Sequence, residues 1–201
     1  MISLLACKDG QAPVLVESLE IFKVEGNESN KKPTELTYKE VKFFDKENYL
    51  YQQHYYSIDN KLKGFEVIKR DGRKAVSNYY ALDSTILAIY NIEYNGVHEV
   101  SRKGYDGQTK EHLRTETYSY DTDGNRIGKE IFTSDGTLTR VFGFNHDTNG
   151  NEIGFSIRDN ANNLLTQETY VITKSDDQSR WLEKWGYVNE QPKTFHRRTL
   201  K

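Results

Sequence analysis

The stretch Tyr118-Ser-Tyr-Asp-Thr-Asp-Gly-Asn-Arg-Ile127 sets the pattern of the whole chain. Twenty-six residues later the chain reads Phe144-Asn-His-Asp-Thr-Asn-Gly-Asn-Glu-Ile153, so that an aromatic residue, Asp, Thr, Gly, Asn and Ile recur in register. A half-unit, Thr133 to Leu138, lies between the two copies and is echoed at Asp159 to Leu164. A repeat of this length indicates one supersecondary unit that is copied along the chain and stacked on its neighbours.

Short polar turn signals recur from Leu36 onward, mostly 11 to 15 residues apart. Many are Asn-Gly or Asp-Gly, which supply the positive φ that tight hairpin turns require. The runs between them are rich in Tyr, Phe, Val, Ile and Thr and often alternate, as in Ile86, Ala88 and Tyr90, which is the period of a β-strand. The pattern predicts an all-β fold: an antiparallel meander of about 12 strands, built from repeated hairpins as an extended or curled sheet. The segment 179–185 fits helical spacing as well, but we predict a strand there.

The central repeat resembles the YD repeat of Rhs-type proteins. That unit runs tyrosine-aspartate, two variable residues, glycine, Asn or Arg, and an aliphatic residue. The positions that carry the resemblance are Tyr120, Asp121, Gly124 and Asn125 in the first copy and Asp147, Gly150 and Asn151 in the second, where His146 replaces the tyrosine. It covers about residues 116–165 and is degenerate elsewhere. The resemblance implies hairpin ribbons that spiral or lie as curved sheets, and the chain is too short to enclose a toxin as large Rhs shells do.

The repeated polar residues have a structural interpretation and a rival one. Asp can accept backbone N–H bonds at a turn, Gly takes positive φ, and Asn tolerates the left-handed region. The same Asp-Thr-Asp-Gly-Asn spacing could ligate calcium, but Phe132 and Arg158 stand where an EF-hand loop has its bidentate Glu. We therefore interpret these positions as turn residues and expect no metal and no cofactor.

Other chemistry finds little support. The five histidines are widely spread without a zinc-ligand spacing. No Gly-x-Ser-x-Gly elbow, phosphate loop or dinucleotide motif occurs. The net charge is −2 with both signs interspersed, so nothing indicates a nucleic-acid partner. We expect a protein that is not an enzyme and has no catalytic residues.

The N-terminus suggests a cellular location. Leu4-Leu-Ala-Cys7 resembles a bacterial lipobox, in which Cys7 would be lipidated, although too few residues precede it for a full signal peptide. Either the true start lies upstream or the chain has an ordinary cytosolic start. We expect three parts: a truncated signal with lipobox over 1–7, a tether and first strand over 8–36, and a β-hairpin repeat domain over 37–201.

Aromatic residues are the candidates for ligand contacts, because Tyr and Trp combine an apolar ring with a polar tip. Tyr49, Tyr51, Trp181 and Trp185 could stack on a ligand, or they could belong to cross-strand ladders that hold the sheet together. The first functional hypothesis is a surface lipoprotein of the bacterial envelope, attached to the membrane only through its lipid, that binds a glycan or a protein. The alternatives are a periplasmic or outer-membrane carrier of an apolar ligand, which needs an apolar concave lining, and a cytosolic immunity or partner-binding protein.

Overall fold

One turn geometry recurs around the molecule. In eight turns the fourth residue has positive φ and donates its N–H to the carbonyl of the first residue, and the first residue donates to the carbonyl of the fifth. Gly124, Gly136 and Gly150 take the fourth position in the repeat region, where φ is 85°, 87° and 77°. Asparagine or serine takes it in the other five turns, at Asn48, Asn60, Ser84, Asn162 and Ser179. Residues that tolerate the left-handed region thus set the ends of most hairpins.

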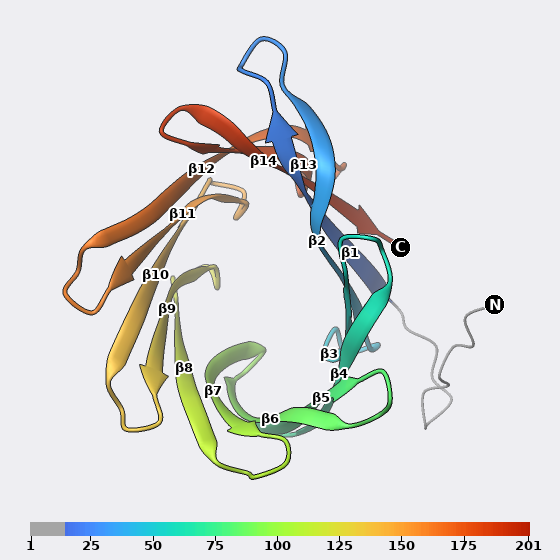
Figure 1. Cartoon of the computed structure of the whole chain (residues 1–201), viewed down its shortest axis with the longest axis vertical. Coiled ribbons are helices and arrows are strands. Elements are labelled where there is room, and N and C mark those ends of the chain that lie inside the picture. Colours follow the sequence, from blue (N-terminus) through green and yellow to red (C-terminus); the bar gives the residue numbers. More distant parts are fainter. Residues whose placement is uncertain (1–14) are drawn as a thin grey trace.

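The computed structural model describes residues 15–201 and consists of fourteen antiparallel strands, with these eight turns among the connections between them (Figure 1). The strands are β1 (Leu15–Glu25), β2 (Lys32–Phe44), β3 (Leu50–Tyr56), β4 (Leu62–Asp71), β5 (Lys74–Ala81), β6 (Ile86–Asn95), β7 (His98–Asp106), β8 (His112–Tyr120), β9 (Arg126–Thr133), β10 (Leu138–His146), β11 (Glu152–Asp159), β12 (Leu164–Ser175), β13 (Trp181–Val188) and β14 (Gln191–Leu200). The all-β antiparallel meander is confirmed, and the segment expected around Trp181 to Trp185 is strand.

The sheet closes on itself, which corrects the expectation of about 12 strands in an extended or curled sheet. Each strand pairs with its neighbour in sequence, and β1 pairs with β14 from Glu17↔Leu200 to Lys23↔Thr194. In Figure 1 the ribbon accordingly runs round a ring in sequence order and brings the first and last strands together. Among residues 15–201 closure leaves no edge strand, and the C-terminal strand β14 completes the sheet.

The barrel also includes most of the part expected as a tether and first strand, 8–36. β1 was expected as a first strand beside a tether, but β2 begins at Lys32, so residue 36, the expected end of that part, lies within a strand. The segment around Gly26 to Asn30 is the turn between these strands, where Asn30 donates its N–H to the carbonyl of Asn27. The strands pair over their length with two register shifts, so they form a hairpin that belongs to the barrel.

Apolar packing inside the ring is limited. Ile68, Ala75 and Ile92 form the buried cluster, with Ile92 only 1% exposed. The other most buried side chains include several glutamates, a lysine and a histidine. In a closed meander of alternating strands one face points to the interior, so the interior is largely polar. Within residues 15–201 no helix is long and apolar enough to cross a membrane.

Candidate binding site in the barrel interior

Four glutamates with tyrosine partners form the interior's recurring unit. The exposed fractions of Glu40, Glu66, Glu116 and Glu168 are 6%, 3%, 3% and 8%. Three of them accept a hydrogen bond from the tyrosine two residues away on the same strand: Glu40 from Tyr38 (2.5 Å), Glu116 from Tyr118 (2.8 Å) and Glu168 from Tyr170 (3.4 Å). Glu66 accepts one from Tyr55 on the neighbouring strand (2.9 Å). Burial raises the pKa of each of these phenols, followed by the negative charge of nearby glutamates, so each tyrosine is a donor at neutral pH.

The repeat places these glutamates. Glu40 and Glu66 are 26 residues apart, and Glu116 and Glu168 are twice that distance apart. They lie on β2, β4, β8 and β12, which are four of the seven even-numbered strands, and they fall in two registers because Glu66 and Glu116 are 50 residues apart. These glutamates were not among the predicted site residues. A Glu-x-Tyr or Tyr-x-Glu pair on a strand is the signal that could have revealed three of them, but Glu66, whose tyrosine lies on the neighbouring strand, carries no such signal.

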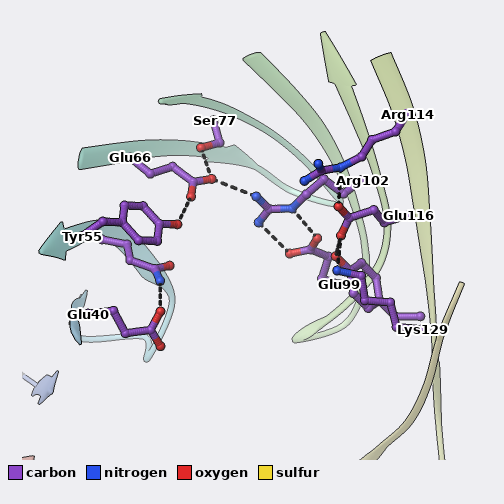
Figure 2. Close-up of polar contacts among 11 residues, drawn as sticks. Glu40, Tyr55, Glu66, Ser77, Glu99, Arg102, Arg114, Glu116 and Lys129 are labelled. Carbon is purple, nitrogen blue, oxygen red and sulfur yellow. Dashed lines mark hydrogen bonds and ion pairs between the residues drawn. The ribbon is translucent and has the colours of Figure 1, made fainter. Parts of the chain in front are cut away.

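Glu66 stands at the centre of one wall (Figure 2). Its carboxylate accepts from Ser77 at 2.5 Å and from Arg102 at 2.9 Å. Arg102 also makes a two-point contact with Glu99, at 2.8 and 3.2 Å. Burial opposes the charge of Arg102, but Glu99 and Glu66 outweigh it and raise the pKa of the guanidinium above its ordinary value. This network therefore joins β4, β5 and β7 along the interior wall, and Arg102 keeps its charge.

A second carboxylate, Glu116, is held between two cations. Arg114 and Lys129 both lie 2.7 Å from its oxygens. Burial alone would raise the pKa of Glu116, but the hydrogen bonds from Lys129 and Tyr118 and the nearby cations lower it below its ordinary value. Glu116 therefore stays charged, and it orders two cationic side chains on the cavity wall.

The sector formed by β12, β13 and β14 has a different balance. Glu168 accepts from Tyr170 and, in a short hydrogen bond, from Thr194, and burial raises its pKa. Lys184 lies 3.6 Å above the Tyr170 ring, and burial lowers its pKa. His196 contacts Thr194 at 2.9 Å, and burial followed by the charge of Lys184 lowers its pKa to about 3. In this sector burial therefore disfavours the charged form of all three groups, Glu168, Lys184 and His196.

The polar walls enclose open space. A cavity of about 530 Å³ is lined by five tyrosines, three of the buried glutamates and four cations, with Gln53. A second cavity of about 400 Å³ adjoins it, and the two share Gln53, Arg102, Tyr118 and Arg126. The volume is in the range of small-molecule sites, but the lining is far more polar than is usual for apolar ligands. The arrangement can hydrogen-bond a ligand rich in hydroxyl groups while tyrosine rings contact its apolar faces.

The repeat's turn residues lie at one end of the barrel. Asp121 Oδ1 accepts the N–H groups of Asp123 (3.0 Å) and Asn125 (2.8 Å), and its Oδ2 accepts from the Asn125 side chain. Asp147 makes the same contacts with Asn149 and Asn151. The carboxylates are thus occupied within their own turns. Tyr120, the first residue of the motif, donates its hydroxyl to the Glu99 carbonyl at 2.7 Å.

Neighbouring turns are also joined to one another. The Asn151 side chain donates to the Ser179 carbonyl at 2.9 Å and accepts the Trp181 N–H at 3.0 Å. Asn125 is placed the same way toward the next turn, because its Oδ1 would lie 2.8 Å from a Cβ on Gly150. The Asn of the motif therefore links turns around the rim, a role that the sequence analysis did not include.

The four aromatic candidates do not form one surface. Tyr49 lines the second cavity, where its ring lies 4.0 Å from the Arg70 guanidinium carbon. Tyr51 follows on β3. Trp181 lies near Lys184, at 4.6 Å. Trp185 packs on Phe195 at 4.8 Å, on the sheet face opposite to Lys184 and His196. Of the four, only Tyr49 lines either of the two adjoining cavities within residues 15–201, and it lines the second one.

No metal centre or lipidation site is visible in the described part of the chain. Between residues 15 and 201 no three His, Cys, Asp or Glu side chains are placed to hold a metal ion. The part expected as a signal with lipobox, 1–7, and with it Cys7, lies outside the described residues.

Comparison with known proteins concerns the fold alone. No family model and no curated protein matches the chain, so the resemblance to the YD repeat stays a prediction. Among solved structures, a porin-like protein from Bacteroides uniformis ATCC 8492 matches with a TM-score of 0.52 and 11% identity, over 92% of this chain and 97% of that one. It supports the closed all-β architecture.

Two weaker likenesses support no conclusion by themselves. A DUF1329 family protein from Desulfovibrio piger ATCC 29098 matches with a TM-score of 0.34 and 10% identity, over 95% of this chain and 86% of that one. An outer membrane lipoprotein-sorting protein domain from Vibrio parahaemolyticus matches with a TM-score of 0.30 and 11% identity, over 93% and 84%.

Proposed function

We propose that this protein is a non-enzymatic binding protein of the bacterial cell envelope and that its barrel interior holds a glycan. The observation that carries the proposal is the lining of the larger cavity, where five tyrosines alternate with glutamates, arginines, Lys129 and Gln53 around about 530 Å³. Saccharides present hydroxyl groups at their edges and C–H groups on their faces. A wall of fixed charged acceptors and donors with interspersed rings matches both.

The lining argues against the apolar-ligand carrier. Such a carrier needs a contiguous apolar wall, whereas Glu40, Glu66 and Glu116 stand on this one. Moving an apolar ligand against these charges would displace water from them without replacing its hydrogen bonds, which is unfavourable.

A protein ligand is the second candidate and would use the outer face. Several apolar side chains there are strongly exposed, with Ile58 and Leu82 each 60% exposed and Leu87 47% exposed. These residues lie in or beside the turns at the end of the barrel opposite to the Asp121 and Asp147 turns. A partner at this surface would not enter the cavity, so variants of the interior separate the two candidates.

Two adjacent residues of β5 provide the test. Tyr79 lines the cavity, whereas Tyr80 stacks on Phe65 at 5.1 Å on the opposite face. Binding of the full chain to a panel of oligosaccharides should reveal a ligand by calorimetry. Tyr79→Ala should then weaken binding about tenfold or more, the loss of about 1.4 kcal/mol expected for one ring contact, and Tyr80→Ala should leave it unchanged. No retained saccharide, or equal effects of the two variants, would count against an interior glycan site.

The location in the cell envelope and the lipid on Cys7 are parts of the same proposal. Mass spectrometry of the protein purified from its native host tests them: acyl chains on Cys7 as the first residue of the mature chain are expected. An unmodified chain that begins at Met1 and fractionates with cytosolic proteins would instead support the cytosolic partner-binding alternative.

A further inference from the structure

The second cavity, of about 400 Å³, lies toward the rim formed by the turns that follow β2, β4, β6 and β8. Its charged lining is unequal: four cationic side chains, Lys42, Arg70, Arg102 and Arg126, stand against a single carboxylate, Glu99. Glu99 is engaged in its two-point contact with Arg102, and Lys42 pairs with Glu40 at 2.7 Å. The two remaining arginines decide what this part of the interior can bind.

Arg70 is held rigidly without a carboxylate. Its guanidinium lies between the rings of Tyr49 and Tyr94, at 4.0 Å from each centroid. Two of its N–H groups donate to the carbonyls of Gly72 and Gly96. A guanidinium has five N–H donors, so three of them have no acceptor among residues 15–201. Stacking fixes the plane of the group and leaves part of its edge available.

Arg126 is more available still. It is exposed in the interior, its guanidinium carbon lies 4.5 Å above the Phe144 ring, and it lines both cavities. Among residues 15–201 it makes no ion pair and no side-chain hydrogen bond. An arginine that stacks on an aromatic ring with its donors free is suited to planar, bidentate recognition of an anionic group.

We propose that the glycan is acidic, with a carboxylate or sulfate group that Arg126 binds and Arg70 attracts toward the rim cavity. This inference rests on the proposed glycan site and names the chemical class of its ligand. The other cations on this wall are neutralised by protein carboxylates. The excess positive charge is therefore localised on two preoriented guanidinium groups that the fold leaves unpaired. A neutral saccharide would leave both of them without a counter-ion.

The test compares acidic and neutral ligands on the full chain by calorimetry. The probes are an oligogalacturonate, its methyl ester, which lacks the charge at equal size, and a sulfated oligosaccharide. The variant is Arg126→Gln, and Arg158→Gln is the matched control, because Arg158 lies on the outer face of β11 and, in the described part of the chain, donates only to the Asn162 carbonyl. Melting curves of both variants show that the fold is retained.

We expect the wild-type protein to bind at least one acidic probe tenfold or more tightly than the methyl ester, with an affinity that falls as salt rises. Arg126→Gln should remove that preference, and Arg158→Gln should keep it; the preferred probe tells carboxylate from sulfate. Equal binding of the ester, or a preference that survives Arg126→Gln, overturns the acidic ligand while leaving the glycan site standing. Binding of none of the probes or of any neutral saccharide overturns both proposals.

Discussion

At Gly124 the turn requires a residue without a side chain. Its φ is 85°, and a Cβ there would lie 2.9 Å from the His98 ring. We expect Gly124→Val to reduce the free energy of unfolding by about 1–3 kcal/mol, because a β-branched residue is strained in the left-handed region. This corresponds to a melting temperature lower by several degrees for a chain of this size. Thr122→Val, an exposed change in the same turn, should melt like the wild type; an unchanged melt for Gly124→Val would refute the turn assignment.

Asn151 offers a test of the contacts between turns. It is 7% exposed and bonds both Ser179 and Trp181 of the next turn. Asn163 has the same place in its own turn but is exposed, and its side chain bonds only Asp159 within residues 15–201. Removal of a buried group that satisfies two partners costs about 1–3 kcal/mol, so Asn151→Ala should lower the urea midpoint clearly and Asn163→Ala much less. Equal shifts would mean that the link between turns contributes nothing.

His196 predicts a pH dependence of stability. Burial and Lys184 lower its pKa from 6.5 to about 3 in the folded protein. As pH falls below about 6.5, the unfolded chain takes up a proton that the native state refuses until about pH 3, so stability falls across this window. The His196 ring is faced by Tyr170 and Glu168 on β12 and by Lys184 on β13. Glu168 has the opposite effect on stability: its pKa is raised in the folded protein, so near pH 4.5 the native state binds a proton more readily than the unfolded chain does.

The measurement is the urea midpoint from pH 7 to pH 3 for the wild type and for His196→Gln. The variant should lose part of the acid destabilisation because glutamine does not titrate. Profiles of the same slope would show that the burial of His196 does not govern acid stability.

At the scale of the element, turn chemistry carried most of the predictive power of the sequence. Asp-Gly and Asn-Gly placed the hairpins because the positive φ of a turn is a local requirement. Alternation identified the strands because it too is a local property of the sequence. The loop at Gly26 to Lys31 was recognised, but the segment that holds β1 and the start of β2 was not recognised as part of the same closed sheet. Only the pairing of β1 with β14, between the two ends of the chain, shows that this segment is part of the sheet, and no local signal records a partner so distant.

The binding site was less predictable than the fold for a similar reason. Tyr49 was identified because it is aromatic, but Trp185 was included on the same ground and lies on the opposite face. Arg70, Arg126 and Glu66 gave no signal because isolated charges on strands usually belong to a solvated face. Whether these residues line the cavity depends on which face of the sheet points inward, and the inward face is defined only once the ring is closed.

At the scale of the whole molecule, closure separates a barrel from an open repeat array. An open array tolerates the loss of a terminal unit, because each unit contacts only its neighbours. Here β14 pairs with both β13 and β1. A chain that ends after Glu190 should therefore expose two strand edges and aggregate or unfold, as size-exclusion chromatography and circular dichroism would show.

The matched control is a circular permutant. Val16 and Lys201 exchange backbone hydrogen bonds of 2.9 Å, so a short Gly/Ser linker can join the two ends. Opened in the exposed turn between Asp135 and Gly136, the permutant should keep all fourteen strands and fold. A stable monomer from the shortened chain, or an unfolded permutant, would argue against the closed ring.

The central claim is that the ligand lies inside this ring, and site mapping with a photoreactive glycan tests it most directly. The bound oligosaccharide, carrying a diazirine, is irradiated with the full chain, and the labelled residues are identified by mass spectrometry. If the ligand lies inside, the labels will fall on inward residues such as Tyr55, Tyr79 and Tyr118, which line the larger cavity. Labels concentrated on outward residues such as Phe65 and Tyr80 would contradict it.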